Sequence, residues 1–111
     1  MQIDATKYEG ALILRVDASR IDAAVAIEFK ESVRLAAEAP GNPLVLDLSS
    51  VTFLDSSGLG AVVAIMKLLA PERRLELAGL TPNVAKVFRL TRMDTMFTIH
   101  DAAPGALRAA G

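Results

Sequence analysis

Three adjacent polar side chains, Asp55, Ser56 and Ser57, lie where an apolar, strand-like run gives way to a helical pattern. The run Leu44–Leu48 precedes them, and the apolar stretch Leu59–Met66 follows. The first N–H groups of a helix have no intrahelical acceptor, and the aligned peptide dipoles leave a partial positive charge there. Such a junction can hold an anion. A serine in it can therefore cap the helix or carry a phosphate.

A plain helix N-cap is the alternative interpretation, because Asp and Ser are favoured at that position for backbone hydrogen bonding alone. Gly58 and Gly60 follow the serines in the first turns of the predicted helix. Each glycine costs up to about 1 kcal/mol relative to alanine in a helix, and a mere cap does not require them. We interpret them as leaving the turn open to close approach by another protein, or by an enzyme that must reach a hydroxyl.

Length and composition exclude several classes of protein. The 111 residues, 52% of them hydrophobic, suit one ordinary domain spanning residues 1–111. The formal net charge of -1 makes nucleic acid a poor candidate partner. The longest apolar stretch is too short to span a bilayer, and no secretory signal pattern opens the chain. The absence of cysteine removes disulfides and thiolate chemistry. We expect a cytoplasmic protein, and the oligomeric state stays open.

Catalysis by the serines would need a base, and His100 is the only histidine. The Gly-x-Ser-x-Gly signature of a serine hydrolase is absent, and His100 lies at the far end of a predicted strand. We therefore expect no enzyme, no metal and no cofactor. Asp47 is interpreted as an ordinary strand-end aspartate.

Two further groups of residues have alternative interpretations. The methionines after the serine pair are expected to fill the core. A basic group on a later helix is expected to form a solvated face, with an acidic partner as the alternative. The methionines are Met66, Met93 and Met96, and the basic residues are Lys86, Arg89 and Arg92.

The elements that must position the serine pair follow from hydrophobic periodicity and turn residues. Helices are expected from Asp22 to before Pro40, from Ser56 to Leu69, from Thr81-Pro82 onward with a capping Thr81 hydroxyl, and weakly over Pro104–Ala110. Strands are expected at Ile3–Tyr8, Ala11–Asp17, Leu44–Leu48, Leu75–Gly79 (half-buried) and Phe97–His100. An opening hairpin followed by alternating helices and strands predicts an α/β fold. We expect a mixed sheet of about four to five strands, parallel after the hairpin, packed with about four helices.

The segment from Val45 to Ala61, VLDLSSVTFLDSSGLGA, resembles the signature of the STAS domain found in bacterial anti-sigma factor antagonists. The resemblance extends upstream to RIDAA at Arg20 and downstream to LELAGLTPNV and VFRLTRMDTMF, so it covers nearly the whole chain. It implies that Ser57 is the phosphoacceptor. It also implies that Asp22 corresponds to the family's acidic residue before the first helix, and Asp55 to the one that opens the motif.

The resemblance implies a phosphorylation-controlled switch between protein partners that regulates transcription. The unphosphorylated chain would bind an anti-sigma factor that is also a serine kinase, and a separate phosphatase would restore the hydroxyl. A phosphate adds about -1.5 to -2 charge, which would weaken that contact. The expected binding surface consists of Asp22, Asp55, Ser56, Ser57, Gly58, Leu59 and Gly60.

A different role is also open from the sequence. Some STAS-like proteins are subunits of larger assemblies, such as lipid-transport or stress-sensing complexes. In such a subunit Ser57 need not be phosphorylated.

Overall fold

The predicted opening hairpin is present. Strands β1 (Gln2–Tyr8) and β2 (Ala11–Asp17) pair antiparallel along their full length. Glu9 and Gly10 form the connection, and both have positive φ. Two residues with positive φ are what a tight hairpin turn requires, and glycine adopts this conformation without steric cost.

The remaining strands join this hairpin in parallel, in the order β1-β2-β4-β6-β7. The computed structural model describes residues 1–105, and the prediction of a mixed α/β sheet is confirmed. The strands are β4 (Leu44–Asp47), β6 (Leu75–Ala78) and β7 (Ile99–His100). The helices are α1 (Ala26–Ala36), α2 (Ser56–Leu69), α3 (Pro82–Leu90) and the short 3-10 helix η1 (Met93–Thr95).

The described residues thus contain three α-helices, where about four were expected. The fourth expected helix, Pro104–Ala110, falls mainly on residues 106–111, which lie outside the described part of the chain. No helix within residues 1–105 is long and apolar enough to cross a membrane.

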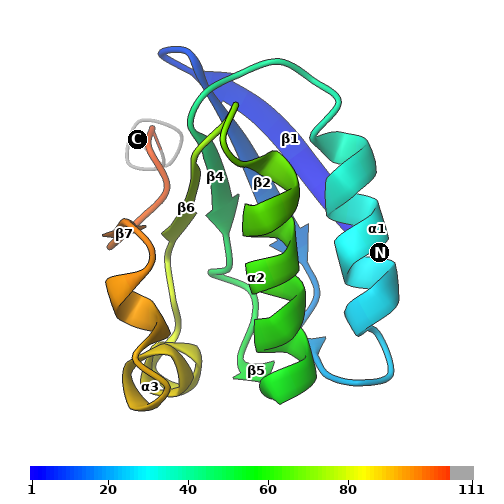
Figure 1. Cartoon of the computed structure of the whole chain (residues 1–111), viewed down its shortest axis with the longest axis vertical. Helices are drawn as coiled ribbons and strands as arrows, with labels where there is room; N and C mark the ends of the chain where they lie inside the picture. Colours follow the sequence, from blue (N-terminus) through cyan, green and yellow to red (C-terminus); the bar gives the residue numbers. More distant parts are fainter. Residues whose placement is uncertain (106–111) are drawn as a thin grey trace.

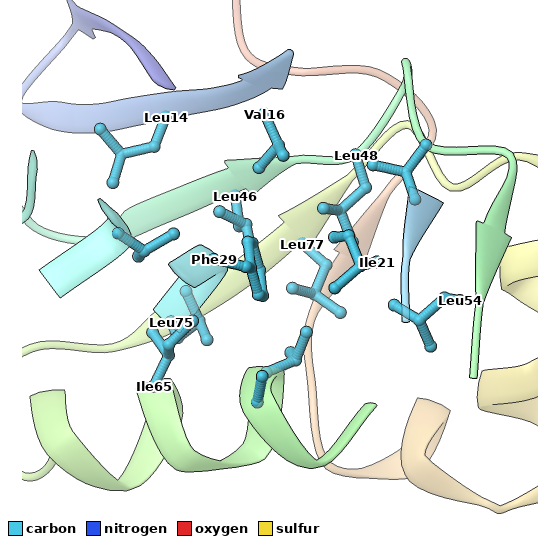
Figure 2. Close-up of a cluster of buried hydrophobic side chains, with 14 of the residues drawn as sticks. Leu14, Val16, Ile21, Phe29, Leu46, Leu48, Leu54, Ile65, Leu75 and Leu77 are labelled. Carbon is cyan, nitrogen blue, oxygen red and sulfur yellow. The ribbon is translucent and has the colours of Figure 1, made fainter. Parts of the chain in front are cut away.

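Helices α1 and α2 lie side by side over one face of the sheet (Figure 1). Alternation along the strands supplies this face with buried side chains, such as Leu14 and Val16 on β2. Figure 2 shows these side chains meeting Phe29 of α1 and Ile65 of α2 in one apolar layer. Residues of opposite parity, such as Ile13, form a smaller cluster on the other face.

A second, two-stranded sheet was not predicted. Strands β3 (Arg20–Ile21) and β5 (Phe53–Leu54) pair in parallel and bring together the segments that precede α1 and α2. Ile21 and Leu54 point into the core from this pair. In Figure 1, β5 and the start of α2 lie at the lower end of the molecule, toward which β4 also points. The serine pair therefore lies at the carboxyl end of the parallel strands.

Four local expectations were wrong. Helix α1 begins at Ala26, four residues beyond the expected Asp22 start. Strand β6 is buried throughout, including Glu76, where a half-buried strand was expected. The Thr81 side chain does not cap α3. Met96 is 48% exposed and does not fill the core.

Candidate functional site

Helix α2 begins with a carboxylate cap, as the sequence indicated. Asp55 has an extended backbone, and its Oδ1 accepts a hydrogen bond from the Gly58 N–H at 3.0 Å. The Leu59 N–H donates to the Asp55 carbonyl at 2.9 Å and opens the regular helix ladder. This geometry is that of an N-cap whose side chain bonds the third residue of the helix.

The second carboxylate oxygen of Asp55 reaches a different loop. Its Oδ2 accepts a hydrogen bond from the Ala23 N–H at 3.2 Å. Next to it, Asp22 closes a turn in which Oδ1 accepts from the Ala24 N–H at 3.1 Å. Asp22 is therefore a turn residue and not a helix cap, but Asp55 links it to the start of α2.

Gly58 is required by packing, which corrects the prediction that it opens the turn. A Cβ added at Gly58 would lie 2.3 Å from the Ile21 carbonyl oxygen, closer than atoms can approach. Gly58 is itself a buried residue of α2, at the point where the first turn of the helix faces Ile21 of β3. Gly60 differs, because a Cβ there would meet nothing within 4 Å. Only Gly60 fits the expectation of an open approach to the helix.

The expected binding surface is thus partly exposed and partly buried. Gly58 and Leu59 lie in the interior, and Asp22 and Asp55 are half-buried. The residues that face solvent are Ser56, Ser57 and Gly60.

Both serines keep free hydrogen-bonding groups. Within residues 1–105 neither the Ser56 hydroxyl nor the Ser57 hydroxyl makes a hydrogen bond, and neither of the two backbone N–H groups has an acceptor. Two exposed hydroxyls therefore stand beside two unused N–H donors at a helix start, an arrangement that accommodates negative charge.

Arg20 and Phe53 also border this site, and sequence reasoning missed them. The Arg20 guanidinium lies 4.2 Å from the centre of the Phe53 ring. Its Nε is 3.5 Å from Asp22 Oδ2. Both residues belong to the β3–β5 pair, whose two-residue strands carry no periodicity, so the sequence offered no signal for them.

His100 belongs to a different cluster, which supports the prediction that it is no partner of the serines. Its Nε2 lies 2.7 Å from Glu76 Oε1, and Arg74 Nε lies 2.6 Å from Glu76 Oε2. Burial alone would raise the pKa of Glu76, but the hydrogen bonds with His100 and Arg74 hold that pKa below its ordinary value. No group of residues within 1–105 has the arrangement of a metal site.

This chain has an α/β fold with an exposed serine pair at a carboxylate-capped helix start, and it is similar to known proteins. Residues 2–106 match the STAS domain, and the chain belongs to that family. An anti-sigma-B factor antagonist from Listeria monocytogenes is 32% identical over 83 residues, which are 74% of this chain and 73% of the relative. The resemblance inferred from the sequence is confirmed.

Solved structures agree with the family match. The crystal structure of an anti-sigma factor antagonist from Mycobacterium paratuberculosis is 27% identical, with a TM-score of 0.80 over 97% of this chain and 92% of that one. The Bacillus cell fate determinant SpoIIAA, solved in its phosphorylated form, is 18% identical, with a TM-score of 0.63 over 99% of this chain and 100% of that one. The second similarity concerns the fold alone.

Proposed function

We propose that this protein is an anti-sigma factor antagonist controlled by phosphorylation of Ser57. The unphosphorylated protein binds an anti-sigma factor that is also a serine kinase, through the exposed surface around Asp22 and residues 55–60. The sigma factor is then released. The kinase transfers a phosphoryl group from ATP to Ser57, and a separate phosphatase removes it. The protein acts in the cytoplasm by binding and catalyses no reaction itself.

The exposed, unbonded Ser57 hydroxyl beside Asp55 is the observation that carries this proposal. A kinase can reach this hydroxyl without opening the fold, and the unused N–H donors of the helix start favour the phosphate once it is attached. Ser56 shares the exposure, so the choice of Ser57 rests on its position in the STAS motif. SpoIIAA, which has this fold, has been solved in a phosphorylated form.

Phosphorylation weakens partner binding by placing charge inside the contact surface. A phosphate adds about -1.5 to -2 charge at neutral pH, close to the carboxylate of Asp55. Like-charge repulsion and desolvation of the phosphate both oppose burial against a partner. A penalty of about 3 kcal/mol would weaken binding roughly a hundredfold.

The switch works locally, without refolding the domain. The helix dipole stabilises negative charge at Ser57, so the phosphate does not oppose the existing structure. A change of fold would require a second packed state that the phosphate stabilises selectively. We expect unchanged circular dichroism on phosphorylation, and amide NMR shifts confined to the neighbourhood of Ser57. Shifts across the whole sheet would instead indicate an allosteric rearrangement.

Phosphorylation by the cognate kinase with ATP, followed by peptide mass spectrometry, tests the acceptor. Ser57→Ala is expected to abolish incorporation, and Ser56→Ala, the matched exposed neighbour, to retain it. Phosphate on Ser56 alone would reject the assignment. If neither serine accepts phosphate while the protein copurifies with transporter or stress-complex subunits, the alternative role as a non-phosphorylated subunit is correct.

The negative charge of Asp22 is tested separately. Asp22→Asn removes the charge but keeps an oxygen that can accept from the Ala24 N–H, so the turn is retained. We expect weaker binding to the anti-sigma factor with unchanged stability. Glu72→Gln removes one charge from an exposed site in the loop before β6 and serves as the control. Equal binding by both variants would show that the Asp22 charge has no role in recognition.

A further inference from the structure

The outer surface of α3 and of the turn after it carries three exposed cations, Lys86, Arg89 and Arg92. None of them forms a salt bridge or hydrogen bond through its side chain within residues 1–105. By contrast, Arg34 pairs with Glu31 and Arg74 pairs with Glu76. The three cations are therefore available to an external anionic group.

Two large apolar side chains of the same segment of the chain are also exposed. Leu90 is 71% exposed and Met96 is 48% exposed, although most apolar side chains of the described chain are buried or partly buried. Apolar side chains exposed together and bordered by charge are typical of contact surfaces. We name this region the α3 basic surface, consisting of Lys86, Arg89, Leu90, Arg92 and Met96.

A pocket of about 270 Å³ adjoins the α3 basic surface. Its apolar lining comes from Leu80, Ala85, Phe88 and Ile99, and Arg89 contributes to its wall. Residues four apart lie on the same stripe of a helix. Arg89 therefore shares a stripe with Ala85, inside the pocket, and Lys86 and Leu90 occupy the neighbouring stripe. Arg89 thus lies in the pocket wall and next to the stripe that carries Lys86.

This surface lies beside the serine site but does not include it. Asn83 of α3 donates a hydrogen bond from Nδ2 to the Thr52 carbonyl at 3.5 Å, in the segment leading to β5. In Figure 1, α3 occupies the lower left of the molecule, and β5 lies between it and the start of α2. A partner on the serine site can therefore extend onto α3, or a different partner can bind α3 alone.

We propose that the α3 basic surface binds an acidic segment of a protein partner that carries an apolar anchor residue. The anchor enters the pocket, and carboxylates of the segment contact the three cations. A protein segment fits better than an anionic membrane, because Asp94 and Asp101 also line the pocket. Those carboxylates would face the membrane charge, whereas a peptide can place its acids against the cations only.

The test uses the full chain, labelled with ¹⁵N, and a capped peptide with several glutamates on each side of one phenylalanine. At low ionic strength we expect amide shift changes concentrated in residues 82–101, and weaker binding as salt is added. Replacing the peptide's phenylalanine with serine removes the anchor and is expected to weaken binding about tenfold, the loss expected for one buried aromatic group.

A triple variant locates the contact. Lys86→Ala, Arg89→Ala and Arg92→Ala together are expected to weaken peptide binding about tenfold, with an unchanged fold, because all three side chains are exposed. The matched control removes three other exposed and unpaired cations and is expected to bind like the wild type. Its changes are Lys7→Ala, Lys30→Ala and Lys67→Ala.

Three results would overturn the proposal. Absence of any shift change with the peptide would exclude an acidic ligand of this kind. Equal losses of peptide affinity in the triple variant and its control would show that the peptide is attracted to any exposed cation. Sedimentation with phosphatidylserine vesicles that the triple variant abolishes, without peptide binding, would assign the surface to a membrane.

Discussion

Helices α2 and α3 begin with similar sequence signals, yet their first residues have different roles. Asp55 caps α2 through the Gly58 N–H and leaves two serines exposed. Thr81 precedes α3, but its hydroxyl donates to the Val51 carbonyl at 2.6 Å and caps nothing. The start of α3 is thus tied to a neighbouring loop, while the start of α2 keeps groups that an external partner can use.

A capping signal in the sequence therefore determines where a helix begins but not what the capping side chain does. At α3, a capping side chain would accept from the N–H of Asn83 or Val84, and the Thr81 hydroxyl accepts from neither. That hydroxyl instead donates to the Val51 carbonyl. At α2, the Asp55 carboxylate has two acceptor atoms and serves both the helix and the loop at Ala23.

Gly58→Ala is expected to have the largest effect on stability. The start of α2 packs against a backbone carbonyl, which cannot rotate away as a flexible side chain can. The added methyl group would lie 2.3 Å from the Ile21 carbonyl oxygen, so β3 or the helix must move. We expect a loss of about 3 kcal/mol in the free energy of unfolding, the upper range for overpacking. Urea denaturation monitored by circular dichroism measures it.

Gly60→Ala is the matched control, since its methyl group would enter open space. It is expected to stabilise the protein by about 0.5 to 1 kcal/mol through helix propensity. If the two glycine variants behave alike, the contact between Gly58 and Ile21 does not constrain the helix.

Much of the fold was predictable from local patterns. The bounds of α2, Ser56–Leu69, follow from a capping aspartate at one end and Pro71 near the other. The β1–β2 hairpin follows from the Glu9-Gly10 turn between two strand-like runs. The predicted start of α1 was wrong because Asp22, the expected cap, uses its carboxylate in a turn. The N-cap residue is instead Val25, which makes no side-chain hydrogen bond to the helix.

The position of the candidate site was predictable from the sequence, but the residues that pack around it were not. The serine pair and Asp55 were located by their place between a strand and a helix. The roles of Ile21, Arg20 and Phe53 depend on the pairing of two very short strands far apart in the sequence. Such pairing leaves no periodic pattern, so the buried role of Gly58 could not be inferred.

Asp55→Ala is expected to have the next largest effect on stability, about 2 kcal/mol. The variant leaves the N–H groups of Gly58 and Ala23 without acceptors, one in the helix and one in the loop. Asp55→Asn should retain about half of the stabilisation, because its amide offers one acceptor oxygen where the carboxylate offers two. Equal stability of the Asn variant and the wild type would mean that the bond to Ala23 contributes nothing.

Thr81→Val tests the other helix start and should cost about 1 kcal/mol, the usual contribution of one hydrogen bond. The change keeps the shape of the side chain and removes the donor to the Val51 carbonyl. Thermal unfolding measures the loss, and Thr81→Ser, which keeps the hydroxyl, should restore most of it. If Thr81→Val is as stable as the wild type, the hydrogen bond to Val51 does not stabilise the start of α3.

Substitution of Ser57 is expected to have the smallest effect on stability and the largest on function. The hydroxyl is exposed and unbonded, so Ser57→Ala should change the free energy of unfolding by less than about 0.5 kcal/mol. Ser57→Asp should stabilise the protein by about 0.3 to 1 kcal/mol, because a negative charge there interacts favourably with the helix dipole. This gain should shrink in high salt. A destabilising Ser57→Asp, measured by urea denaturation at low and high salt, would mean that the start of α2 cannot accommodate a phosphate.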